Sequence, residues 1–139
     1  MREILFRGKA INRDRGYHRT NYKNGDWVYG LITRLYDERF ENLPAEMSDF
    51  GASGIEIDYK TIGQYAGLTD KNGKKIFEGD IVKLHLIDYT EMGVIKYNDI
   101  MCRFMFFTKD GSYSFDNTND FEVIGNIHDN PELLKGGAE

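Results

Sequence analysis

Short stretches of alternating apolar and polar residues recur along the chain and give the first indication of its structure. Over residues 81–87, Val82, Leu84 and Leu86 alternate with polar neighbours, which is the two-residue period of a strand with one buried face. Residues 55–60 repeat this pattern. Similar runs between turn-forming residues complete the set of predicted strands, which covers residues 4–10, 27–35, 55–60, 64–68, 75–77, 81–87, 92–97, 101–108, 113–115 and 121–127.

Three segments between or after these strands have other patterns. Residues 12–26 are polar and rich in turn formers, so we expect an exposed loop there. Pro44 prevents a helix from running through residues 36–54, although a single helical turn over residues 44–47 fits the sequence. Near the end, Asn130 is a good helix N-cap followed by a proline, which predicts one terminal helical turn.

These elements predict an all-β protein. Five predicted strands with short links follow residue 76, and their number and spacing suit an SH3-like or OB-like barrel, in which closure of the sheet removes exposed strand edges. We therefore expect an irregular N-terminal β subdomain with long loops over residues 1–75 and an SH3-like β-barrel over residues 76–139. At 139 residues, the two parts are small enough to form one compact unit.

Residues 64–83 join these two parts and are punctuated by glycines. Asn72 and Gly73 are a strong signal for a type I′ hairpin turn, because both residue types tolerate a positive φ. Backbone geometry explains the three glycines of this stretch. Asp70 and Asp80 are expected to cap turns through bonds from their carboxylates to the backbone.

The same stretch carries a family resemblance. It contains Gln-Tyr-Ala-Gly-Leu, then Asp-Lys-Asn-Gly-Lys and then Glu-Gly-Asp-Ile-Val, and together with residues 1–7 and 124–134 it resembles the YopX family of small phage and prophage proteins. Ala66 stands where the family usually has threonine, and Phe77 where tyrosine is common. The resemblance implies an all-β fold with an SH3-like barrel in the second half, and it implies no reaction. The structural family motif consists of Gln64, Tyr65, Gly67, Leu68, Asp70, Asn72, Gly73, Glu78, Gly79 and Asp80.

Composition supports the strands and suggests a cellular location. Nine tyrosines, nine phenylalanines and fifteen glycines with only two prolines favour strands and tight turns. Cys102 is the single cysteine, and its apolar surroundings predict a buried, inert thiol. The first ten residues lack the apolar core of a secretory signal, and no apolar run approaches the roughly 20 residues of a membrane span. We therefore expect a cytoplasmic protein that does not contact membranes, and the resemblance to phage and prophage proteins implies that the cell is a bacterial host.

Charge is distributed unevenly, although the net charge is only −5. Residues 1–23 contain seven Lys or Arg against two acids, which gives +5, whereas residues 37–58 contain seven acids against one arginine, which gives −6. Segments of opposite sign can meet within one chain or between subunits, and they suit subunit association, so we expect a homo-oligomer held by these two segments. The alternative is a nucleic-acid-binding module, in which basic side chains contact phosphates and aromatic rings stack on bases. For either role, the candidate binding residues are Arg13, Arg15, Tyr17, Arg19, Tyr22 and Lys23.

No motif in the sequence predicts catalysis. The three histidines, His18, His85 and His128, have no partners at metal-binding spacing. Neither a Gly-x-Ser-x-Gly motif nor a phosphate-binding glycine loop occurs. We therefore expect no catalytic residue, no metal site and no cofactor, and a protein that acts by binding or by self-assembly.

Overall fold

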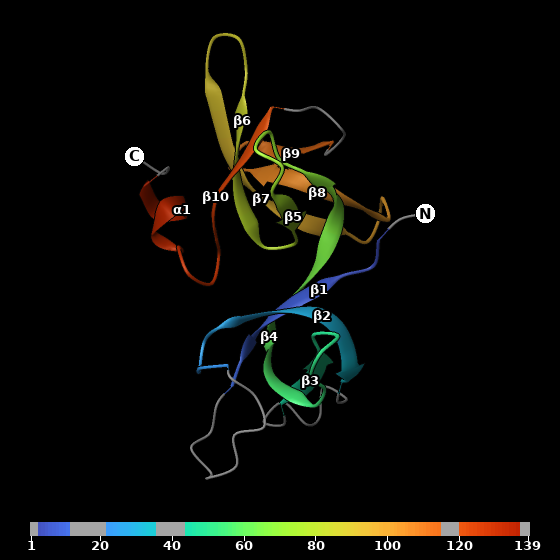
Figure 1. Ribbon diagram of the computed structural model, residues 1–139. Helices are drawn as coiled ribbons and strands as arrows, with labels where there is room; N and C mark the ends of the chain where they lie inside the picture. Colours follow the sequence, from blue (N-terminus) through green and yellow to red (C-terminus); the bar gives the residue numbers. More distant parts are fainter. Residues whose placement is uncertain (1–2, 12–21, 36–43, 115–119, 137–139) are drawn as a thin grey trace. The chain divides into compact units, whose positions relative to one another are not determined.

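The computed structural model describes residues 3–11, 22–35, 44–114 and 120–136. These residues form ten strands and one short helix (Figure 1), which confirms the predicted all-β fold. The chain divides into two compact units, residues 1–64 and 65–139, and the long strand β4 contributes to both. The elements are β1 Phe6–Ala10, β2 Trp27–Arg34, β3 Ala45–Ser48, β4 Ile55–Thr69, β5 Lys75–Phe77, β6 Asp80–His85, β7 Thr90–Asn98, β8 Arg103–Thr108, β9 Gly111–Ser114, β10 Phe121–Asn126 and α1 Glu132–Gly136.

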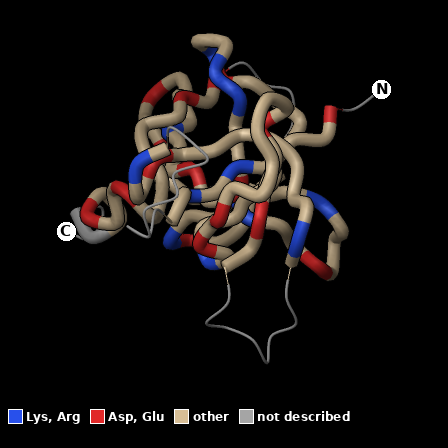
Figure 2. The backbone as a smooth tube through the Cα atoms, turned by 60° about the horizontal axis from the view of Figure 1, so that its bottom comes forward, with Lys and Arg blue, Asp and Glu red and all other residues tan. Residues whose placement is uncertain are grey.

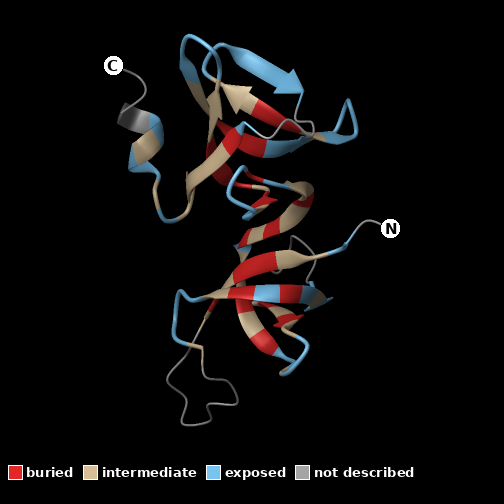
Figure 3. Ribbon diagram, turned by 45° about the horizontal axis from the view of Figure 1, so that its top comes forward, coloured by how far each residue is buried: buried red, intermediate tan, exposed pale blue. Residues whose placement is uncertain are grey.

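The first unit is built from four antiparallel strands. Strand β1 pairs with β2, β2 with β3 and β3 with β4, and β4 pairs again with β1, so the hydrogen bonding returns to the strand where it began. The alternating apolar residues of these strands face one shared core, whose residues appear as buried segments in Figure 3. The core residues are Ala10, Val28, Ala45, Met47, Ile55 and Ile57.

A register shift interrupts the pairing of β1 with β4. Between Arg7 and Lys9 of β1, the partner in β4 changes from Gly63 to Asp58. The hydroxyl of Thr61 accepts a hydrogen bond from the backbone N–H of Lys9 at 2.8 Å and donates one to the carbonyl of Asp58 at 2.6 Å. The threonine side chain therefore takes the place of a strand partner where the ladder is irregular.

The second unit contains a five-stranded antiparallel sheet in the order β10-β6-β7-β8-β9. The end of β4 and the short strand β5 form a separate hairpin, in which Tyr65 lies opposite Phe77. Ala66 and Ile76 of this hairpin belong to the same buried cluster as side chains of the sheet, so the hairpin packs against the sheet. The buried cluster consists of Ala66, Ile76, Val82, Ile95, Phe106 and Phe121.

Two glycines allow neighbouring strands to approach closely. A Cβ atom on Gly30 of β2 would overlap the carbonyl oxygen of Ser48 in β3. A Cβ atom on Gly93 of β7 would overlap the carbonyl oxygen of Phe107 and lie 2.6 Å from the ring of Phe106. A glycine within a strand often marks either a bulge or a close backbone approach, and Gly30 marks a close approach of β2 to β3.

The turn between β4 and β5 differs from the predicted type I′ turn. Of the pair Asn72-Gly73, only Gly73 has a positive φ, at 82°. The N–H of Gly73 donates to the carbonyl of Asp70 at 3.0 Å, and the N–H of Asp70 donates to the carbonyl of Lys74 at 2.7 Å. This pattern is a type I turn followed by one left-handed glycine. The type I′ prediction is wrong because the carboxylate of Asp70 caps the turn and favours this longer loop.

Two other local predictions are wrong, and one is confirmed. Residues 45–48 form strand β3 and not a helical turn, because pairing with β2 and β4 on both sides outweighs the weak helical signal after Pro44. Cys102 is exposed in the turn before β8, with a φ of 53°, instead of being buried in a strand. The terminal helical turn is present as α1, where the N–H of Leu133 donates to the carbonyl of Asn130 at 3.1 Å.

Candidate binding surfaces

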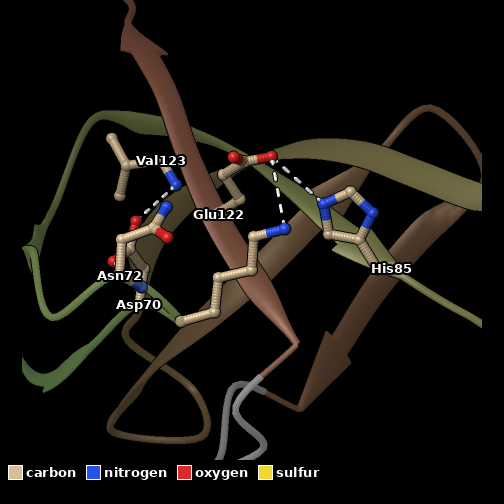
Figure 4. A network of polar contacts seen from close by, with 6 residues as sticks. Asp70, Asn72, His85, Glu122 and Val123 are labelled. Atoms are coloured by element: carbon tan, nitrogen blue, oxygen red, sulfur yellow. Dashed lines mark hydrogen bonds and ion pairs between the residues drawn. The ribbon is translucent and has the colours of Figure 1, made fainter.

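Asp70 connects the β4–β5 turn to strand β10 (Figure 4). Its Oδ1 accepts hydrogen bonds from the N–H groups of Asn72 and Lys74, both at 2.9 Å, and its Oδ2 accepts one from the N–H of Val123 at 3.0 Å. Burial alone would raise the pKa of the Asp70 carboxyl, but the three backbone donors outweigh it and the pKa is lowered. The predicted turn cap is therefore confirmed, and the same carboxylate also holds β10.

Asp80 and Gly79 have similar structural roles at the next turn. The side chain of Asp80 is fully buried, and its Oδ2 accepts a hydrogen bond from the N–H of Phe77 at 2.8 Å. Gly79, with a φ of 91°, donates its N–H to the carbonyl of Ile95 at 2.7 Å and accepts at its own carbonyl from the N–H of Ile127 at 2.9 Å. These two motif residues therefore hold β5, β7 and the end of β10 together.

A polar cluster next to Asp70 joins β6, β10 and the β4–β5 turn (Figure 4). The Oε1 of Glu122 lies 3.1 Å from the Nε2 of His85 and 3.9 Å from the Nζ of Lys71. The hydrogen bond with His85, together with the nearby charge of Lys71, lowers the pKa of Glu122 despite partial burial. Each side chain of this cluster is about one-third exposed, so the cluster contributes little to stability.

The loop after β3 holds a phenylalanine in an exposed position. The Oδ2 of Asp49 accepts a hydrogen bond from the hydroxyl of Tyr22 at 2.7 Å, and its Oδ1 accepts from the N–H groups of Gly51 at 2.9 Å and Ala52 at 2.6 Å. Phe50, which lies between Asp49 and Gly51 in the chain, has a φ of 73° and is 71% exposed. Because the left-handed conformation costs such a residue roughly 1–2 kcal/mol, the bonds to Asp49 are needed to maintain it.

The Tyr22–Asp49 bond also joins the basic and acidic segments within one chain. The hydrogen bond to the carboxylate, reinforced by partial burial, raises the pKa of Tyr22 to about 12. The N–H of Ala52 and the hydroxyl of Tyr22 lower the pKa of Asp49. The ring of Tyr22 packs against the core of the first unit. Both the ring and the hydroxyl of this predicted binding residue therefore have partners inside the chain.

Two cations of β1 lie against the ring of Trp27 in β2, and one of them, Arg7, is buried. The guanidinium carbon of Arg7 lies 4.6 Å from the ring centroid of Trp27, and the Nζ of Lys9 lies 5.4 Å from it. Both distances lie within the range of cation–π attraction. Tyr29, which lies opposite Arg7 in the sheet, is 45% exposed.

The outer side of β3 and β4 is acidic. Glu46 of β3 lies directly opposite Glu56 of β4, and Arg34 at the end of β2 lies 3.5 Å from the carboxylate of Glu46. Like charges directly opposite each other in a sheet repel, and Arg34 offsets part of this repulsion. Asp58 of β4 lies opposite Lys9 of β1, which places the basic and acidic segments side by side in the same unit.

The predicted binding residues are placed only in part. Four of them lie outside the described residues: Arg13, Arg15, Tyr17 and Arg19. Lys23 is exposed, and its backbone N–H donates to the carboxylate of Asp26 at 2.8 Å. Phe50 was not among the predicted binding residues, although the sequence Asp49-Phe50-Gly51 contains a signal for its loop, since aspartate often forms a turn with the backbone of the residues that follow it.

The described residues contain no group of three or more His, Cys, Asp or Glu side chains placed to hold a metal ion. Within the same part of the chain, no helix is long and apolar enough to cross a membrane.

Comparison with known proteins identifies the family. The family described as YopX protein matches residues 10–135. The chain belongs to the YopX family. Among solved structures, this YopX chain is similar to protein EF1440 from Enterococcus faecalis, with 27% sequence identity and a TM-score of 0.55 over 96% of this chain and 99% of that chain. A search of curated proteins finds no match.

The motif that carries the YopX resemblance coincides with residues that the fold uses. Gly67, Gly73 and Gly79 all have positive φ values, and Asp70 and Asp80 are buried carboxylates that accept backbone hydrogen bonds. The motif of this YopX chain is therefore explained by chain geometry, and the exposed surfaces described above are the candidates for binding.

Proposed function

We propose that this YopX chain is a phage or prophage accessory protein that works in the cytoplasm of a bacterial host by binding and self-assembly, without catalysing a reaction. The structural use of the motif carboxylates supports this proposal, because Asp70 and Asp80 accept bonds from the backbone. We also propose an SH3-like barrel for the second unit. Its support is the β4–β5 hairpin, which packs on the five-stranded sheet around one core.

The proposed contact joins the basic segment of one copy, residues 1–23, to the acidic segment of another, residues 37–58. Both segments belong to the first unit, where Lys9 lies opposite Asp58, and Figure 2 shows charges of both signs along the described chain. Because one unit carries both signs, a twofold axis can pair basic with acidic twice in a dimer. The observation that carries the proposal is the loop that presents Phe50, an exposed aromatic anchor within the acidic segment.

Charge reversal tests this contact. One variant reverses acidic positions, with Glu41→Lys and Glu56→Lys, and a second reverses basic positions, with Arg15→Glu and Arg19→Glu. Each variant alone should show a lower mass than the parent in light scattering, whereas an equal mixture should recover the parent mass, because unlike charges face each other again. Added salt should lower the mass of the parent. A parent whose mass changes with neither salt nor reversal excludes the charged contact.

Substitution of Phe50 separates binding from folding. Glycine adopts the left-handed conformation without strain, so Phe50→Gly should leave the free energy of unfolding unchanged or slightly increased while it weakens association. A purely structural phenylalanine would give the opposite result, with lower stability and the same mass. Tyr113→Ser is the matched control, since it removes a half-exposed aromatic ring from β9 in the second unit, outside both charged segments.

Binding of single-stranded nucleic acid is the competing proposal. The cation of Lys9, 5.4 Å from the ring of Trp27, favours it, because Trp27 follows the arginine-containing segment 12–21 closely in the sequence. A gel shift with a mixed-sequence oligonucleotide at low salt decides between the two, since charge-driven binding weakens steeply as salt is added. No shift at micromolar protein removes this alternative.

A further inference from the structure

A groove in the second unit runs beside helix α1 and has a volume of about 650 Å³. Apolar side chains line it from two strands and the helix: Met92 and Val94 of β7, Phe107 of β8 and Leu134 of α1. These four side chains form the apolar part of a mixed lining, and this part suits an apolar side chain from another segment. The remaining lining residues are Thr90, Glu91, Gly93, Lys96, Thr108 and Lys109.

The tip of the β6–β7 hairpin exposes apolar side chains without any described cover. Ile87 is fully exposed, Tyr89 is 60% exposed and Leu86 is 40% exposed. A hydrogen bond from the N–H of Leu86 to the carbonyl of Tyr89, at 2.9 Å, closes the turn. In Figure 1 this hairpin extends beyond the neighbouring strands of its sheet. Consecutive exposed apolar residues of this kind are typical of an interaction site.

We propose that the hairpin tip of a second copy of this chain occupies the groove. The tip contains one acid, Asp88, among its apolar residues. The groove presents two lysines, Lys96 and Lys109, against one acid, Glu91, beside its apolar residues, so its net positive charge complements the acid of the tip. The tip cannot fill the groove of its own chain, because the paired register from Ile81↔Val94 to His85↔Thr90 holds the hairpin extended.

Symmetry makes the contact reciprocal. The tip ends at Tyr89 and the groove begins at Thr90 on the same hairpin, so a twofold axis between them places each tip over the groove of the other copy. This inference rests on the proposed function only because both require self-association. The hairpin contact is apolar and lies on the second unit, whereas the charged contact proposed above lies on the first unit. With both contacts, low salt should give a species larger than a dimer, and high salt should leave a dimer held by the hairpin tips.

Sedimentation of the full chain at low and high salt tests the inference with a matched pair of variants. Ile87→Ser removes the exposed apolar side chain of the tip, and Ile100→Ser removes an isoleucine that is 92% exposed at the β7–β8 turn. Burial of one isoleucine contributes about tenfold to an association constant or more, and the symmetric contact contains two. We therefore expect Ile87→Ser to raise the high-salt dimer dissociation constant at least about 100-fold, and Ile100→Ser to leave it unchanged.

Charge exchange identifies the occupant as a second copy. In the background of Glu41→Lys with Glu56→Lys, which removes the charged contact of the first unit, Asp88→Lys and Lys96→Asp should each weaken the low-salt dimer, and their mixture should restore it, because low salt leaves this charge pair unscreened. A parent that is monomeric at high salt, or an Ile87→Ser variant that dimerises like the parent, overturns the inference. The charge-reversed variants of the first unit should still form the dimer at high salt, but they should no longer form the species larger than a dimer at low salt. This combination of results supports both contacts. A salt-sensitive oligomer that Ile87→Ser does not change overturns the hairpin contact alone.

Discussion

Replacement of Asp70 by asparagine tests whether the family motif acts through structure. The Asp70 carboxylate accepts three backbone hydrogen bonds, two within its own turn and one from the N–H of Val123 in β10. Asparagine has nearly the same shape, so it keeps one oxygen for the turn. Its second group is an NH₂ donor, however, which would face the donor N–H of Val123. Asp70→Asn therefore removes one of the bonds between the hairpin and β10 and leaves a partly buried N–H without its acceptor, while the bond from the N–H of Lys71 to the carbonyl of Phe121 remains.

The expected loss of stability follows from these bonds. A hydrogen bond to a charged acceptor contributes about 1.5–3 kcal/mol, and an unsatisfied buried donor costs about 1–3 kcal/mol. These values overlap in part, so we expect the second unit to lose about 2–4 kcal/mol of unfolding free energy, or roughly 5–15 °C in Tm for a protein of this size. Asp110→Asn is the control, because Asp110 is exposed in the β8–β9 turn; it should change stability by less than about 0.5 kcal/mol.

Urea unfolding followed by circular dichroism measures the difference, and its pH dependence identifies the cause. The pKa of Asp70 is lower in the folded chain than its ordinary value of 3.8. The carboxylate therefore stabilises the fold at every pH above that value, and the contribution is lost as the pH falls through the folded pKa. The stability difference between the parent and Asp70→Asn should be full at pH 7 and shrink below about pH 4. Equal stability of Asp70→Asn and Asp110→Asn at pH 7 would refute the reasoning.

Three other predictions concern the two units separately. Gly30→Ala and Gly93→Ala should each destabilise the unit that contains it by about 1–3 kcal/mol, because the added methyl group overlaps a neighbouring strand; chemical unfolding with one fluorescent or dichroic probe per unit tests this, and parent-like stability would contradict it. In ultraviolet titration of the parent, one tyrosine should ionise near pH 12, and the Tyr22→Phe variant should lack this transition. Because folding raises the pKa of Tyr22, its hydrogen bond stabilises the fold fully below pH 10, and this stabilisation is lost as the pH approaches 12. Cys102 should react with a thiol reagent in the native protein as fast as in urea, since it is exposed, whereas slow native reaction would restore the buried thiol that the sequence predicted.

Patterns that repeat within a few residues made much of the fold predictable. Period-two alternation located the strands of the second unit, including β6 at residues 80–85 and β10 at residues 121–126, because one face of each strand meets the core. The Asp70 cap and the terminal helical turn were also predictable, since each depends on the chemistry of one or two residues. The turn type at Asn72-Gly73 could not be predicted from these two residues alone, because the carboxylate of Asp70, two positions before Asn72, determines it.

The features that matter for binding depend on segments distant in the sequence. Phe50 is held exposed because Tyr22, 27 residues before Asp49, donates to that carboxylate. The groove combines β7 and β8 with Leu134 of α1, and its relation to the hairpin tip at Ile87 exists only after β6 and β7 have paired. Local patterns along the chain determined where it forms strands and which faces are buried. The tertiary structure alone decided which exposed residues share a surface, because pairing and packing between distant segments set those neighbours.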